Sequence, residues 1–329
     1  MDRRFFLGGL AAGAVAPIAA RAQPAPNPVA AANANVIGVI AGGLDGTYTR
    51  FAADLAAVLD GVDGLRILPI LGKGSLGNLS DLLYLRGIDI AIVQSDVLAA
   101  AAQQRLFPGL AQQVHYIAKL YDEEVHVFAR PDMEQLSDLA DQLVSMDNPG
   151  SGTAMTATLL FSHLGIPVRP VYYPTVDATE KLRRGDIAAM VRVTGKPARF
   201  TTPLAEGTRL LSIPLSPALL ETYLPASFTS ADYPALIPAG QTVDTVAVGA
   251  VLAAYNHQVA DRRDRVVRFA RALSLKREAF SQPPRHPKWR EVNLAASVPG
   301  WTRFGSQPSR PAPQPQPRRS RFTPESNAG

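Results

Sequence analysis

Residues 36–59 read VIGVIAGGLDGTYTRFAADLAAVL, joining an apolar run to a glycine-rich turn and an amphipathic segment. The run 36–41 is too continuously apolar for a half-exposed sheet, so it predicts a strand that is covered on both faces. Segment 47–59 places Phe51, Leu55 and Leu59 on one side of a helix. A buried strand followed by a helix predicts a crossover unit of a parallel α/β sheet.

The same succession continues along the chain. A second amphipathic helix is predicted around 76–83, and further apolar runs predict strands at 65–71, 88–93, 126–129, 143–146 and 187–193. Glycines mark the places where a helix gives way to a strand, namely Gly61, Gly64, Gly87, Gly165 and Gly185. The predicted architecture is therefore α/β.

The length of 329 residues is about twice that of a usual single domain, which predicts two lobes with separate cores. A weak internal repeat agrees, because RGIDIAIVQ at 86–94 resembles RGDIAAMVR at 184–192, although chance similarity is an open alternative. The predicted divisions are a signal peptide at 1–22, a linker at 23–35, a first lobe at 36–130, a second lobe at 131–243, a return to the first lobe with C-terminal helices at 244–305, and a disordered proline-rich tail at 306–329.

The N-terminus, MDRRFFLGGLAAGAVAPIAARAQ, has the features of a secretory signal. An arginine pair precedes an apolar stretch that is short of the roughly 20 residues needed to span a bilayer. We therefore predict cleavage after Ala22 and a periplasmic location. Arg3 and Arg4 fit the twin-arginine pattern, with the general secretory route as the alternative.

Composition excludes several function classes. The formal charge of +5 sits at the two ends, because residues 1–22 hold three arginines against one aspartate and residues 306–329 hold four arginines against one glutamate. The body between them is neutral, so it has no basic stripe, and we predict no nucleic-acid partner. The absence of cysteine excludes disulfides and thiolate metal sites. We predict a monomer without a cofactor.

Glycine-rich loops follow the predicted strands, at the edge where open α/β sheets bind ligands. Free N–H groups at the helix starts beyond such loops favour an anion. Simple helix capping is the alternative for Thr47, Ser75 and Thr153 taken singly. The candidate binding residues are Gly46, Thr47, Tyr48, Lys73, Ser75, Asn78, Gln94, Ser151, Gly152, Thr153 and Arg192.

Arg192 ends its predicted strand at the place that Gln94 occupies in the repeat, so both side chains are predicted to face the cleft. Its guanidinium group matches the geometry of a carboxylate. The alternative is that Arg192 neutralises a neighbour such as Asp45, Asp177 or Glu180.

Enzymatic signatures are absent from the sequence. It contains no nucleotide-binding P-loop, no G-x-S-x-G elbow and no H-E-x-x-H pair. Glu123 and Glu124 could suggest paired carboxylates, but adjacent residues in an extended turn point apart, and we expect both to be exposed to solvent.

Taken together, these motifs resemble the TAXI-type solute-binding proteins of TRAP transporters. The matching pieces are GGLDGTY at 42–48, GKGSLGNLSDL at 72–82, GIDIAIVQSDV at 87–97, NPGSGT at 148–153, IPAG at 237–240 and TVAV at 245–248. The resemblance implies a type II periplasmic-binding-protein fold with two hinged lobes, TRAP membrane subunits as partners, and a small carboxylate ligand such as glutamate or 2-oxoglutarate. It places Gly46, Thr47, Tyr48, Ser75, Asn78, Gln94, Ser151, Gly152 and Thr153 in the cleft.

The function predicted from the sequence is therefore that of a receptor for a small organic anion, either a carboxylate or an acidic amino acid. Two alternatives are an enzyme on the same fold, such as a dehydratase, and a ligand-sensing subunit of a membrane signalling protein.

Overall fold

The computed structural model describes residues 27–44 and 46–305. Contacts divide the chain into one unit up to Ala34 and a second from Asn35 onward. In the first unit, helix α1 (Pro28–Asn33) is capped by the side chain of Asn27, which accepts hydrogen bonds from Val29 N and Ala30 N. The predicted signal peptide and the predicted tail lie outside the described residues.

The second unit is built on one mixed sheet with the strand order β2-β1-β3-β10-β4-β7-β5-β6; β8 pairs with β4, and β9 with β10. The strands are β1 (Val36–Ile40), β2 (Arg66–Ile70), β3 (Ile90–Gln94), β4 (Val114–Ala129), β5 (Leu143–Ser145), β6 (Arg169–Val171), β7 (Ala189–Thr194), β8 (Arg209–Leu210), β9 (Leu224–Thr229) and β10 (Thr242–Tyr255).

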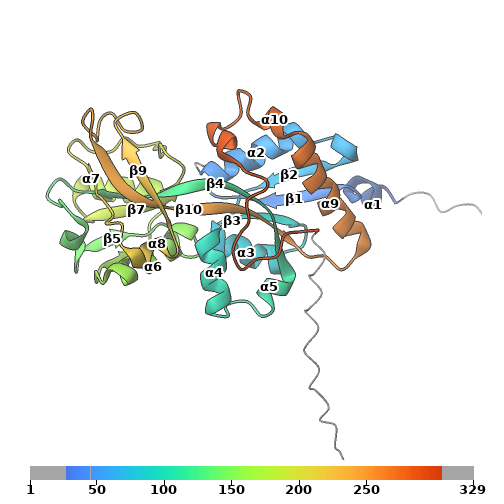
Figure 1. Cartoon of the computed structure of the whole chain (residues 1–329), viewed down its shortest axis with the longest axis horizontal. Coiled ribbons are helices and arrows are strands. Elements are labelled where there is room, and N and C mark those ends of the chain that lie inside the picture. The colour runs from blue at the N-terminus through green and yellow to red at the C-terminus, as the bar shows by residue number, and fades with distance from the viewer. Residues whose placement is uncertain (1–26, 45, 306–329) are drawn as a thin grey trace, which may run out of the picture. The chain divides into compact units, whose positions relative to one another are not determined.

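Two long strands, β4 and β10, run through both halves of this sheet (Figure 1). The C-terminal part of β10 pairs with β3, and its N-terminal part pairs with β9. Strand β4 pairs with β10 along its first part and with β7 along its last part. We call the half built on β1, β2 and β3 the first lobe and the half built on β5, β6 and β7 the second lobe. The predicted fold class is confirmed: an α/β fold with two lobes, joined by crossing strands.

Helices cover both faces of the sheet in each lobe. They are α2 (Thr47–Leu59), α3 (Ser75–Tyr84), α4 (Ser95–Gln103), α5 (Leu110–Gln113), α6 (Gly152–Leu164), α7 (Thr175–Arg184), α8 (Pro217–Leu220), α9 (Ala260–Leu275) and α10 (Arg277–Phe280), with short 3-10 turns η1 (Val62–Gly64), η2 (Leu136–Leu139) and η3 (Pro287–Glu291). None of the helices in the part of the chain that the structure describes is long and apolar enough to cross a membrane.

Four clusters of buried side chains correspond to these covered faces. In the first lobe, Phe51 of α2 and Phe269 of α9 belong to one cluster, and Leu79 of α3 belongs to another. In the second lobe, Leu160 of α6 and Leu182 of α7 belong to separate clusters. Strands covered on both faces explain the continuous apolar runs in the sequence.

The predicted helix-to-strand boundaries are confirmed at all five glycines, Gly61, Gly64, Gly87, Gly165 and Gly185, which have positive φ. The strand predicted at 126–129 is only the last part of β4, which begins at Val114. It was predicted too short because only 126–129 forms an apolar run. The expected exposure of Glu123 and Glu124 is wrong. Both lie within β4 and are buried, because β4 is here an interior strand and both of its faces are covered.

Candidate functional site

Five helices begin at one cavity of about 270 Å³ between the two lobes. The residues that precede their first turns all line it: Gly46 before α2, Gly74 before α3, Gln94 before α4, Ser151 before α6 and Pro174 before α7. This convergence follows from the topology, since each of these helices follows a strand whose carboxyl end meets the others at the same edge.

The helix starts make the cavity favourable for an anion. Among the described residues, the residues preceding α2, α3, α4 and α7 make no side-chain capping bond; in α6 the Ser151 hydroxyl accepts from Ala154 N, and in α4 Asp96 Oδ1 accepts from Val97 N at 2.7 Å. First-turn N–H groups without a side-chain acceptor carry partial positive charge and can donate to a ligand. Several such helix starts around one small cavity give it a positive potential that favours a negatively charged group.

A chain of hydroxyl, carboxamide and carboxyl groups forms the first-lobe wall. The Tyr48 hydroxyl donates to Glu123 Oε2 at 2.7 Å and lies 3.4 Å from Ser75 Oγ. Ser75 Oγ donates in turn to Gln94 Oε1 at 3.3 Å. Glu123 comes from the crossing strand β4, and its Oε1 accepts from the Tyr121 hydroxyl at 3.2 Å. Burial raises the pKa of Glu123 to about 8, although the two tyrosine hydroxyls oppose the shift.

Charged groups of both signs occupy the second-lobe wall. Arg192 of β7 donates from Nη1 to Arg199 O at 2.6 Å, and its guanidinium lies 5.1 Å from the ring centre of Phe200. On the paired strand β4, His126 Nδ1 lies 3.3 Å from Arg192 O. Burial raises the pKa of Asp147, and the Arg192 charge opposes the shift. Arg192 thus lines the cavity beside an acidic neighbour.

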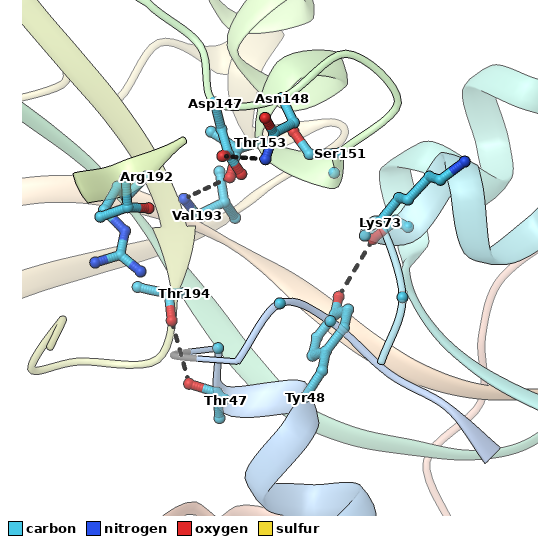
Figure 2. Close-up of a pocket in the computed structure, with 18 of the residues that line it drawn as sticks. Thr47, Tyr48, Lys73, Asp147, Asn148, Ser151, Thr153, Arg192, Val193 and Thr194 are labelled. Carbon is cyan, nitrogen blue, oxygen red and sulfur yellow. Dashed lines mark hydrogen bonds between the residues drawn. The ribbon is translucent and has the colours of Figure 1, made fainter. Parts of the chain in front are cut away.

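The two lobes contact each other around the cavity. Thr47 Oγ1 and Thr194 Oγ1 are 3.1 Å apart, as Figure 2 shows, and Gly77 N donates to Gly150 O at 2.9 Å. A Cβ atom on Gly152 would lie 1.7 Å from Gln94 Oε1. Only glycine at position 152 therefore allows the start of α6 to approach the first lobe this closely. The structure therefore shows the lobes in a closed arrangement.

A buried carboxyl group adds to this closure. Asp96 of α4 in the first lobe accepts a hydrogen bond from the Thr156 hydroxyl of α6 at 2.6 Å and another from the Tyr223 hydroxyl at 3.3 Å. Burial raises the pKa of Asp96 to about 6, against the effect of these hydrogen bonds. Asp96 thus links helices of different lobes.

The structure brings together all but one of the residues predicted from the sequence. The cavity is lined by Gly46, Thr47, Tyr48, Lys73, Ser75, Gln94, Ser151, Gly152, Thr153 and Arg192. Asn78 is not among the lining residues, and its prediction is corrected. Its side chain is fully buried and donates to Ala41 O and Ile92 O, so it ties the ends of β1 and β3 together.

Helix capping, the alternative role for three of these residues, does not apply. Thr47 and Ser75 are the first residues of α2 and α3, and Thr153 is the second residue of α6. Thr153 Oγ1 instead accepts a hydrogen bond from Val193 N at 3.1 Å, which connects α6 to β7 (Figure 2).

Glu123 also lines the cavity, although the sequence did not predict it there. Its neighbour Glu124 pairs with Lys288 Nζ at 2.7 Å. Lys288 lies in the 3-10 turn η3, which is outside the motifs recognised in the sequence. Had residues 123–124 been placed in a strand, the alternation of side chains would have predicted that the two glutamates face opposite sides of the sheet.

Comparison with known proteins gives a family match over most of the chain. A family model described as the NMT1-like family matches residues 39–268. One solved structure, described as a periplasmic transporter, aligns with 74% of this chain and 83% of its own, with a TM-score of 0.49 and 14% identity. The periplasmic binding protein BugD aligns with 78% of this chain and 84% of its own, with a TM-score of 0.48 and 15% identity.

Proposed function

The chain belongs to the NMT1-like family, and from that premise we propose that it is a solute-binding protein that closes two lobes around a small organic anion. It holds the solute by hydrogen bonds and charge and performs no reaction on it. The cavity volume of about 270 Å³ lies near the lower end of the range for small-ligand pockets.

The convergence of five helix starts on one cavity is the observation that carries this proposal. A carboxylate accepts hydrogen bonds only, so it matches a wall of backbone N–H donors and an arginine fork. Contacts between the lobes on several sides of the cavity support a clamp, in which the ligand favours the closed state because only that state surrounds it.

The finer assignment rests on the sequence motifs. Their resemblance to TAXI-type proteins supports a receptor for TRAP membrane subunits, and the N-terminal signal supports export to the periplasm. The ligand is then a carboxylate or an acidic amino acid that the receptor carries to the membrane subunits.

A thermal-shift screen against small carboxylates and amino acids tests the proposal. A ligand at 100 times its Kd adds about 2.7 kcal/mol to the free energy of unfolding, which raises the unfolding midpoint by several degrees. We expect at least one compound to stabilise the protein and to be recovered chemically unchanged. Recovery of a converted product would favour the enzyme alternative, and no stabilisation by any member would contradict the proposal.

A further inference from the structure

Glu123 is a buried acid in the wall of an anion site. It reaches the cavity from β4, and its two oxygens accept hydrogen bonds from Tyr48 and Tyr121. No basic group among the described residues forms an ion pair with it. In its ionised form, a carboxyl group in this position repels a second carboxylate at close range, so Glu123 can ionise only beside a ligand that also brings a cation.

The other charged groups of the cavity do not balance Glu123. The lining residues include two bases, Lys73 and Arg192, and two acids, Glu123 and Asp147. Arg192 acts on the charge of Asp147 in the second lobe, and Lys73 is exposed. In Figure 2 the amino group of Lys73 extends away from Arg192 and from the second-lobe wall. The cavity thus offers donors for an anion and, at Glu123, an acceptor without a cation.

We propose that Glu123 is the specificity-determining residue of this site and that it selects a ligand with a protonated amino group beside its carboxylate. The site would then favour an α-amino acid over the 2-oxo acid of the same carbon skeleton. This inference rests on the proposed function and adds the ligand class.

Glu123 lies in the same wall of the cavity as the starts of α2 and α3. Glu123 is connected to the start of α2 through Tyr48, at 2.7 Å, and Tyr48 contacts Ser75 at the start of α3, at 3.4 Å. The Tyr48 side chain therefore connects Glu123 to the starts of α2 and α3. We expect an ammonium group at Glu123 to leave the carboxylate of the same ligand facing these helix starts, because both line one cavity.

Matched ligand pairs provide the test: L-glutamate with 2-oxoglutarate, and L-alanine with pyruvate. For the wild type we expect the amino acid of at least one pair to bind at least about tenfold more tightly than its oxo acid, because its ammonium group gains an ion pair with Glu123 and the oxo acid gains none. In Glu123→Gln we expect this preference to fall to within about threefold, since glutamine keeps the shape but loses the charge.

The outcomes separate the two proposals. Oxo acids that bind the wild type as tightly as their amino acids would overturn the inference and leave the proposed function standing. If neither members of these pairs nor other carboxylates stabilise the protein, both proposals fail. A preference that survives unchanged in folded Glu123→Gln would also overturn the role of Glu123.

Proton release gives a second readout, which a merely structural role would not affect. Glu123 faces the Tyr48 and Tyr121 hydroxyls and feels the charges of Glu124 and Asp96, and with its pKa raised by burial it largely holds its proton at pH 7 in the empty site. An ammonium group favours the ionised form, so binding of an amino acid should release up to about one proton. Calorimetry in buffers of different ionisation heat should detect this release in the wild type. Equal release by Glu123→Gln would contradict the proposal.

Discussion

Glu123 and Glu124 are adjacent residues of the crossing strand β4, and their side chains lie on opposite faces of it. Both carboxyl groups are buried, but their partners differ. Glu124 is buried against Lys288 Nζ at 2.7 Å, and Lys196 N of the second lobe donates to its Oε2 at 2.9 Å. Glu123, on the other face, is buried with two tyrosine hydroxyls and no cation among the described residues. One carboxyl group is neutralised by the protein itself, whereas the other is left for a ligand.

We expect the Glu124 pair to contribute to stability and Glu123 to contribute to ligand binding. Burial lowers the pKa of Lys288, but Glu124 and Glu291 together raise it above its ordinary value, so the lysine stays charged and completes a buried ion pair with Glu124. Removing one partner of such a pair is costly because it leaves an uncompensated charge. On the Glu123 face the compensating charge comes with the ligand, so changes there should alter affinity and selectivity more than folding.

The largest expected effect is on the Glu124 face. Lys288→Ala should lower the free energy of unfolding by about 3–5 kcal/mol, because Glu124 loses its buried partner. Lys119→Ala is the matched control, since Lys119 pairs with Asp122 at 2.8 Å but is partly exposed; its cost should be below about 1 kcal/mol. Urea denaturation measures both. Equal losses in the two variants would contradict a special role for the Glu124 pair.

On the ligand face, Arg192→Ala should weaken binding of a carboxylate by about 2–5 kcal/mol, roughly thirtyfold or more. The reason is that a ligand charge in the closed cavity loses its bidentate donor. Arg199→Ala is the control, because Arg199 contacts Arg192 through its backbone oxygen, which the substitution retains. Calorimetry on the folded variants decides, and an affinity of Arg192→Ala within about threefold of wild type would give Arg192 a structural role only.

Closure itself can be tested with two glycines that both line the cavity. Gly152→Ala places a methyl group on Gln94 Oε1, whereas a Cβ on Gly43 meets nothing within 4 Å. Overpacking of this kind costs about 1–3 kcal/mol, so Gly152→Ala should lower ligand affinity about tenfold while Gly43→Ala leaves it nearly unchanged. Similar affinities for the two variants would show that the closed contact is not needed for binding.

The smallest effect is a pH dependence at Asp96. Its folded pKa of about 6 lies above the ordinary value of 3.8, so its favourable contribution to stability is present at low pH and is lost as the pH rises from about 4 through 6. Its surroundings are the Thr156 and Tyr223 hydroxyls and the more distant Tyr48 and Glu123. Asp96→Asn should flatten the pH profile of unfolding by about 1 kcal/mol between pH 5 and 8; an unchanged slope would exclude Asp96 as its source.

Local pattern in the sequence was enough for the α/β fold and for most of the site. Apolar runs marked β1, β2 and β3, and glycine-rich loops marked the starts of α2, α3 and α6, because both signals depend on a few neighbouring residues. The first part of β4 was missed because its run VHYIAKLYDEE mixes charged and apolar residues. Its strand conformation depends on pairing with β10, more than 120 residues later in the chain.

The errors in the site have the same origin. Asn78 was assigned to the ligand because it follows a glycine-rich loop, but its carboxamide nitrogen donates to the backbone oxygens of Ala41 and Ile92. Glu123 and Glu124 were expected in solvent because Tyr48 and Lys288, which cover them from other elements, are distant in sequence. Such burial is a property of tertiary packing, which no local pattern encodes.

Thermal unfolding of Glu123→Gln and Glu124→Gln, each alone and with L-glutamate or 2-oxoglutarate, tests the division between the two faces most directly. Glu124→Gln should lower the midpoint of the empty protein and retain the wild-type difference between the two ligands. Glu123→Gln should keep the empty midpoint within about 2 °C of wild type and lose that difference. Two variants that lose stability alike and respond alike to both ligands would contradict the account.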